Sequence, residues 1–370
     1  MVGFAVLPRP GHAHRDMTLE VWEEEVHGGT FPRELFGLSG VEQVRLITSG
    51  KVPLPPIHFL TGMRPTEVGV GSSTFVMPLT GWLLTPQGLM TAGEIAILAD
   101  GPLGCAIQTV LPPATGYTTT ELSINMVRPV PQRGQLLARG RLVHGGRQLG
   151  LSETFVTDDV GRLIAHGTSR CVIFPPDASV PPPPPELPSV VEEGGQDWVP
   201  PYRRPVIGET LDQQVFDQLS GLEVMEGIIS GELPLPPIKH LMGIRPTEAE
   251  EGSATFTIPA TRWLTSPLGL VEGGVTACLA DFALCSAIQT TVPIGAAYAP
   301  TELRVQFIRP VPADGRLVTA RATVVHRGRG LAVSRSEVTN EDGKLVAIGN
   351  ASALILPGRR ADLEDAALGP

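Results

Sequence analysis

The sequence contains few charged residues, few aromatic residues and no cluster of basic ones. Charged residues make up 18% of the 370 positions, too few for a solvated, disordered chain, whereas apolar residues make up 42% and can fill substantial cores. Lys and Arg number 28 against 38 Asp and Glu, which gives a formal net charge of -10. Because no run of Lys or Arg offsets this charge, we do not expect binding to nucleic acid or to an anionic lipid surface.

Long apolar runs are also missing. A membrane-spanning helix needs about 18 or more uncharged apolar residues. The most apolar region, residues 90–112, contains Glu94, Asp100 and Pro102, so we expect no membrane span. The first 16 residues lack the continuous apolar core of a secretion signal, and we expect the protein to be cytoplasmic.

Cysteine is scarce, and motifs for metal or serine chemistry are lacking. The four cysteines show no C-x-x-C spacing, which favours reduced, buried thiols over disulfides. The eight histidines do not form pairs at helical spacing beside carboxylates, and no G-x-S-x-G motif occurs. We therefore expect no metal site, no cofactor and no serine nucleophile.

What the sequence does contain is an internal repeat. Residues 38–100 align without a gap to residues 219–281 at an offset of 181, and about 34 of these 63 positions are identical. The offset becomes 182 after one inserted residue, at Val143/Val325. The repeat predicts two copies of one fold.

A proline-rich segment separates the copies. Its proline run favours an extended, semi-rigid spacer. The predicted division is a first domain with an N-terminal helical extension at residues 1–174, a linker at 175–205, a second domain with a leading helix at 206–358, and a tail at 359–370.

Both copies predict the same order of elements. A leading amphipathic helix, an alternating strand-like segment and a helix that is apolar on nearly every side follow one another. In the first and second copies, the leading helix is predicted at 32–49 and 211–230 and the strand-like segment at 66–79 and 247–260. The apolar helix is predicted at 91–111 and 272–292. Four strand-like runs then close the first copy, at 118–127, 135–144, 148–157 and 163–174. A helix that is apolar all round must be covered by protein, and an antiparallel sheet wrapped around it provides that cover. The predicted fold class is therefore α+β, a double hotdog in which each half wraps a long buried central helix in antiparallel sheet.

A motif lies at the start of each central helix. The second copy reads S-x-x-G-x-x-E-G-G from Ser266 to Gly274, with Asp281 seven residues later. It resembles the hotdog thioesterases of the phenylacetyl-CoA (PaaI-like) type, whose signature is N-x-x-G-x-x-H-G-G followed seven residues later by Asp or Glu. The first copy reads T-x-x-G-x-x-T-A-G from Thr85, with Asp100 in the same place. The resemblance covers about residues 54–174 and 235–356, and it implies hydrolysis of an acyl-CoA substrate.

The chemistry of this motif can be argued from the residues. A glycine pair at a helix start presents unpaired N–H groups at the positive end of the helix dipole, where a developing oxyanion is stabilised. A carboxylate can activate the attacking water as a general base. The carboxylate lies about two turns into the same helix, too far to serve its own helix start, so the other copy must supply it.

The resemblance implies two sites between the copies. The first combines Asp100 and Thr119 of the first copy with Ser266, Gly273 and Gly274 of the second, and we expect it to be the active one. Its second-site counterparts are Thr85, Gly93 and Asp281, and we group Glu272 with these second-site candidates. We expect the second site to be weak or inactive, because Ala92 and Pro300 replace a glycine and a threonine in it. Glu272 and Thr91 occupy the place of the signature histidine, where a glutamate is either protonated, turned away, or itself a base.

Three further expectations follow. Arg147 and Arg329, at matching Gly-Arg turns, are candidates for binding the phosphates of CoA, with solvated turn arginines as the alternative. Because the signature histidine and asparagine are absent, the competing function is a non-catalytic acyl-CoA-binding or sensor protein. The resemblance also implies a homo-oligomer of double-hotdog chains.

Overall fold

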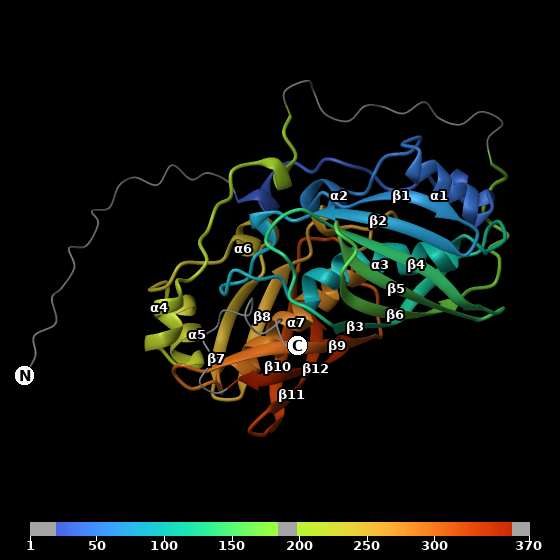
Figure 1. The fold of residues 1–370 in the computed structure, drawn as a ribbon. Helices are drawn as coiled ribbons and strands as arrows, with labels where there is room; N and C mark the ends of the chain where they lie inside the picture. Colours follow the sequence, from blue (N-terminus) through green and yellow to red (C-terminus); the bar gives the residue numbers. More distant parts are fainter. Residues whose placement is uncertain (1–19, 184–197, 357–370) are drawn as a thin grey trace, which may run out of the picture.

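The structure is a computed structural model and describes residues 20–183 and 198–356. Within these residues one antiparallel sheet of twelve strands runs through both copies (Figure 1), in the order β1-β2-β4-β5-β6-β3-β9-β12-β11-β10-β8-β7. The predicted tail and residues 184–197 of the predicted linker lie outside the described residues. The domain boundaries stay a prediction.

The two copies contain matching elements. The helices of the first copy are α1 (Gly40–Thr48), α2 (Pro56–Thr61) and α3 (Ala92–Gln108), with short 3-10 turns η1 (Val21–Glu23), η2 (Arg33–Gly37) and η3 (Gly81–Leu83). Its strands are β1 (Arg64–Gly69), β2 (Ser72–Pro78), β3 (Tyr117–Met126), β4 (Gln135–Gly145), β5 (Leu149–Asp158) and β6 (Leu163–Ile173). The second copy has α4 (Gln213–Gln218), α5 (Gly221–Ser230), α6 (Pro237–Met242) and α7 (Gly273–Gln289), with η4 (Pro201–Arg203) and η5 (Arg262–Leu264). Its strands are β7 (Arg245–Glu250), β8 (Ser253–Pro259), β9 (Ala297–Phe307), β10 (Leu317–Arg327), β11 (Leu331–Asn340) and β12 (Leu345–Leu356).

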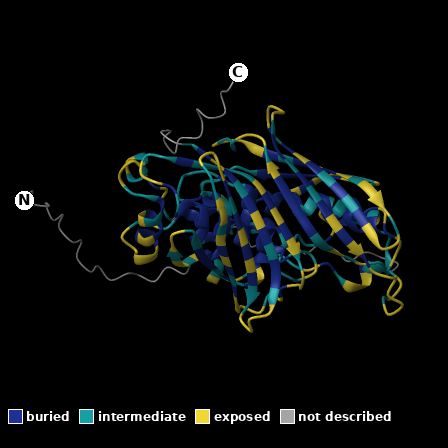
Figure 2. Cartoon of the chain, turned by 90° about the horizontal axis from the view of Figure 1, so that it is seen from below, coloured by how far each residue is buried: buried dark blue, intermediate teal, exposed yellow. Residues whose placement is uncertain are grey.

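The central helices confirm the predicted fold class. α3 lies against strands β2 to β6, and α7 lies against β8 to β12. Every residue of α7 after Gly273 is buried, as the all-round apolar pattern predicts. Buried and exposed residues alternate along the surrounding strands (Figure 2), so one face of the sheet covers the helices and the other faces solvent.

The leading helices were predicted as single units, and this was wrong. Ser39 has an extended backbone, and it forms a capping box with Glu42 that starts α1 anew after η2. Ser220 divides the second leading segment into α4 and α5 in the same way. The predicted alternating segment is a hairpin rather than one strand, because Gly71, with φ of 75°, turns the chain between β1 and β2.

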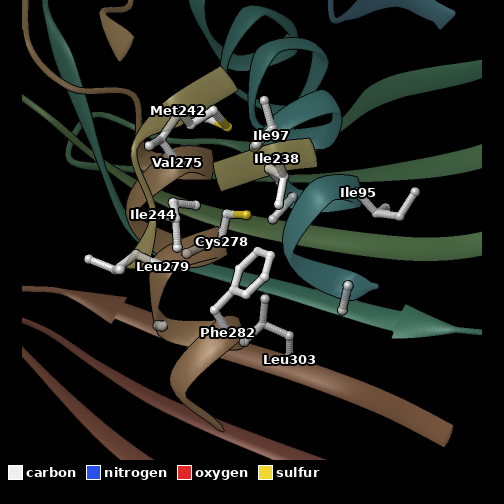
Figure 3. Packing of buried hydrophobic residues seen from close by; sticks show 14 of the residues in the cluster. Ile95, Ile97, Ile238, Met242, Ile244, Val275, Cys278, Leu279, Phe282 and Leu303 are labelled. Atoms are coloured by element: carbon white, nitrogen blue, oxygen red, sulfur yellow. The ribbon is translucent and has the colours of Figure 1, made fainter. Parts of the chain in front are cut away.

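The two halves dock closely. Strand β3 pairs with β9, with Ser123 opposite Arg304, and this joins the two halves of the sheet. α3 and α7 meet near their first turns (Figure 3), where apolar residues of both helices belong to one packed cluster. A Cβ at Gly274 would lie 2.5 Å from the carbonyl oxygen of Ala96, so only glycine permits this approach.

The segment ahead of each copy crosses to the other copy. We call residues 20–31 the first strap and residues 198–211 the second strap. Trp263 of the second copy donates its Nε1–H to the carbonyl of Glu24 at 3.1 Å, and Trp82 of the first copy donates to the carbonyl of Arg204 at 3.1 Å. Arg204 and Glu24 form an ion pair at 2.6 Å. The straps therefore tie both halves together. None of the described helices is both long and apolar enough to cross a bilayer.

Candidate functional site

Each central aspartate is bound by the helix start of the other copy. The Gly274 N–H at the start of α7 donates to Oδ2 of Asp100 at 3.0 Å. The Gly93 N–H at the start of α3 donates to Oδ2 of Asp281 at 2.9 Å. Each aspartate lies about two turns into its own helix, too far to contact the start of that helix. Because α3 and α7 pack together, each aspartate contacts the start of the other helix instead.

A cavity of about 340 Å³ opens beside Asp100, and we call it the first cavity. Its volume lies in the usual range for ligand pockets, roughly 300–1,000 Å³. It brings together all but one of the residues predicted for the first site: Asp100, Thr119, Ser266 and Gly273. Gly274 is the exception, since it lies behind them and binds Asp100. A Cβ at Gly273 would lie 2.9 Å from Oδ2 of Asp100, so glycine lets the carboxylate approach the helix start this closely.

Glu272 lies in the first cavity, not the second, which corrects its grouping with the second-site candidates. It directly precedes Gly273, so the helix start that faces Asp100 carries Glu272 to the same place. Its side chain is 7% exposed, and its Oε2 atom is buried without a hydrogen-bond partner.

The two carboxyl groups differ in their ionisation. Burial raises the pKa of Asp100 to about 6, an effect that the N–H groups of Gly274 and Gly273 partly offset. Burial, and then the charge of Asp100, raises the pKa of Glu272 well above its usual value. Asp100 is therefore the group that ionises first, and its charge opposes ionisation of Glu272.

Thr119 and Ser266 are placed by local backbone features. A bulge in β3 between Thr119 and Glu121 shifts the register against β6. The Thr119 hydroxyl lies 3.7 Å from Sγ of Cys171 at the cavity wall. Ser266 begins a tight turn in which its carbonyl accepts the N–H of Gly269, whose φ is 74°.

Part of the wall of the first cavity depends on two glycines of α3. A Cβ at Gly101 would lie 2.8 Å from the ring of Phe75, and one at Gly104 would lie 2.6 Å from the hydroxyl of Tyr117. His58 also lines this part, and burial lowers its pKa to about 3, so its imidazole is neutral. Sequence reasoning missed these residues because their role depends on packing across elements.

The equivalent space in the other half has a different character. A cavity of about 460 Å³, which we call the second cavity, is lined by Thr85 and Thr91. Both also line an adjoining space of about 40 Å³, which we call the deep chamber. Asp281 is not among the lining residues, and it is only 1% exposed.

Asp281 is closed off by its neighbours. The Thr91 hydroxyl donates to its Oδ2 atom at 2.6 Å, in addition to the Gly93 N–H. The Cys285 thiol donates to Oδ1 at 3.4 Å. Since these donors occupy both oxygens, Asp281 has no open face toward the second cavity.

The predicted CoA-binding arginines are not among the residues that line either cavity, and their role stays a prediction. Arg147 and Arg329 are exposed at their turns. Arg309 lines the first cavity and Arg128 the second. The Arg-Pro pair repeated in both copies was the signal for these two. Within the described ranges no group of three His, Cys, Asp or Glu residues is arranged to hold a metal ion.

Comparisons with known proteins agree on one family. The profile of the thioesterase superfamily matches residues 268–347. A Vibrio cholerae protein, provisionally named an esterase, is 30% identical to this chain over 145 residues. The match covers 39% of this chain and 92% of that protein. The 1,4-dihydroxy-2-naphthoyl-CoA hydrolase of Listeria monocytogenes is 24% identical over 123 residues, or 33% of this chain and 98% of the enzyme.

The likeness to solved structures extends over both halves. A tesB protein of Mycobacterium avium subspecies paratuberculosis has a TM-score of 0.50 and 15% sequence identity, covering 82% of this chain and 98% of that one. At this identity the likeness supports the double-hotdog fold alone.

Proposed function

Because this chain belongs to the thioesterase superfamily, we propose that it hydrolyses acyl-CoA thioesters in the first cavity. The general class, a thioester hydrolase, follows from the family. The substrate class rests on the family resemblance and on the size of the first cavity. The catalytic assignment rests on one observation above all: Asp100 is held at 3.0 Å by the start of α7 and also faces a cavity.

Each residue of the first site has its own role in the proposed hydrolysis. Asp100 takes a proton from water as the water oxygen attacks the thioester carbonyl. The positive end of the α7 dipole at Gly273 and the protonated Glu272 stabilise the charge that develops on the carbonyl oxygen. Thr119 and Ser266 offer hydroxyl groups to orient the water and the substrate. The carbon–sulfur bond then breaks, the thiolate of CoA takes the proton from Asp100, and the free acid remains.

The second cavity does not support the same reaction. Asp281 is sealed by Thr91, Gly93 and Cys285. Pro300 occupies the place of Thr119 and has no hydroxyl to hold a water. Hydrolysis is therefore assigned to the first cavity only.

The test compares two matched substitutions. Asp100→Asn is expected to lower kcat by about 10²- to 10⁴-fold, the usual contribution of a general base. Asp281→Asn, the same change at the equivalent position, should lower it only a few-fold. Both are measured in steady state over a panel of acyl-CoA substrates, after circular dichroism has shown that each variant is folded.

Two results would contradict the proposal. Equal losses from the two substitutions would remove the distinction between the cavities. If the unmodified protein binds acyl-CoA but shows no turnover on any member of the panel, the sensor function would replace hydrolysis.

A further inference from the structure

The second cavity has no acidic residue in its lining, and a lysine of the deep chamber replaces a histidine of the first cavity. Its walls come from positions equivalent to those of the first cavity, so Thr85 matches Ser266 and Thr91 matches Glu272. None of the residues lining the second cavity or the deep chamber is Asp or Glu. Arg128 lines the cavity, and Lys239 lines the deep chamber.

Gln289 presents an unused donor at this place. It is 4% exposed and lines both the second cavity and the deep chamber. Its Oε1 accepts from Nε2 of Gln87 at 2.9 Å and from the hydroxyl of Tyr298 at 3.4 Å, which fixes the orientation of the amide. Its Nε2 is buried without a partner. A buried donor without an acceptor is unfavourable, so a ligand that brings an acceptor gains affinity.

The first copy has no unpartnered amide donor at the equivalent glutamine. There the equivalent Gln108 donates its Nε2 to Oε1 of Gln43 at 2.9 Å. In the second copy Val224 occupies the position of Gln43 and offers no acceptor. The unsatisfied amide thus belongs to the second cavity alone.

Lys239 is a cationic residue that lines the deep chamber together with Gln289. It is 6% exposed and stands at the position of His58 in the first copy. Burial lowers its pKa to about 8, so the ammonium group is still mostly charged at neutral pH. Phe282 and Cys285, in place of Gly101 and Gly104, also line the deep chamber, which leaves a space of about 40 Å³. That space suits a small head group and not a chain.

We propose that the second cavity binds a free carboxylic acid with an apolar tail. The carboxylate accepts from Gln289 and pairs with Lys239 in the deep chamber, and the tail fills the apolar second cavity. This inference rests on the proposed function only in identifying such an acid as the product class of the first cavity. The second cavity is then a binding site for that product class.

The test measures binding of octanoate to the full chain by calorimetry, with 1-octanol as the ligand that has the same tail and no carboxylate. Octanoate should bind at least tenfold more tightly than octanol. Gln289→Leu and Lys239→Met should each weaken octanoate binding by tenfold or more, while Lys239→Arg keeps the charge and most of the affinity. Lys344→Met removes the same charge at an exposed turn and should leave binding unchanged.

A crystal structure with 8-bromooctanoate locates the ligand through the anomalous signal of bromine. The expected position is the second cavity. Four results would overturn the proposal. Bromine could be found only in the first cavity, or octanol could bind as tightly as octanoate. The affinity could be unchanged in both Gln289→Leu and Lys239→Met, or octanoyl-CoA could occupy the second cavity in preference to octanoate. These readouts do not depend on turnover, so a failure of the Asp100 assignment would be seen separately.

Discussion

At the scale of single residues, the pair formed by Asp100 and Glu272 decides the chemistry. Both carboxyl groups line the first cavity, and burial raises the pKa of each. The N–H of Gly274 offsets part of this rise for Asp100, whereas Glu272 has an unpartnered Oε2 atom and ionises only after Asp100. One group can therefore accept a proton while the other donates a hydrogen bond.

This division predicts a bell-shaped pH profile. Asp100 acts when ionised, so kcat/KM should fall as the pH drops through about 6, the pKa to which burial raises it. Glu272 acts when neutral, so kcat/KM should fall again where Glu272 ionises at higher pH. Glu272→Gln keeps a hydrogen-bond donor that does not ionise, and we expect it to remove the alkaline fall, retain the acidic fall and cost less than about tenfold in kcat. The profile of each variant over pH 4–10 gives the answer.

The same variant separates the two roles considered for Glu272. If Glu272 were the base, Glu272→Gln would abolish turnover and Asp100→Asn would not. That result would reverse the assignment of the two carboxyl groups.

At the scale of elements, the start of one central helix and the middle of the other form each site. Glycine at 93 and 274 lets α3 and α7 approach within contact distance, and this brings each helix start to the opposite aspartate. Further along α3, Gly101 and Gly104 leave depth in the first cavity that Phe282 and Cys285 remove from the second.

The depth next to Gly101 predicts control of acyl length. Gly101→Ala places a methyl group against the Phe75 ring, and both residues line the first cavity. We expect kcat/KM for long acyl-CoA substrates to fall at least fivefold more than that for acetyl-CoA. Comparing the two substrates within one variant controls for any general loss of stability. A uniform loss across chain lengths would show that the acyl group does not reach this part of the cavity.

The features predicted correctly from the sequence are those that a recognisable sequence pattern marks. The repeat, the all-round apolar helices and the motif around Gly273 were sufficient to predict the double hotdog and to pair Asp100 with the opposite helix start. The break at Ser39 was missed, although Ser39 and Glu42 form a recognisable capping box. Gly101 and Gly104 could not have been identified, because an unremarkable helix glycine becomes a cavity residue only through what packs opposite it.

At the scale of the whole molecule, the straps hold the two halves in register. The first strap reaches the second copy through Trp263, the second strap reaches the first copy through Trp82, and Arg204 pairs with Glu24 between them. Phe31, at the end of the first strap, lines the first cavity. The straps thus connect the docking of the halves to the shape of the site.

The ion pair between the straps is open to a double-mutant cycle. Arg204→Met and Glu24→Gln should show a coupling energy of about 1 kcal/mol, since both side chains are only partly exposed and the contact is short. Arg141 and Glu153, an ion pair of similar length within the first copy, form the control pair. Chemical unfolding of the two sets gives the coupling energies. If the strap pair shows no coupling, the contact contributes nothing to holding the straps together.

The covalent joining of two copies has a consequence for how the cavities could diverge. In a symmetric assembly of identical chains, every substitution appears in both sites at once, so one site cannot be altered while the other keeps its activity. Here position 101 is glycine and its counterpart 282 is phenylalanine, and position 272 is glutamate while its counterpart 91 is threonine. Duplication within one chain lets each cavity inherit its own changes, so that one can be specialised for turnover while the other drifts toward a separate ligand.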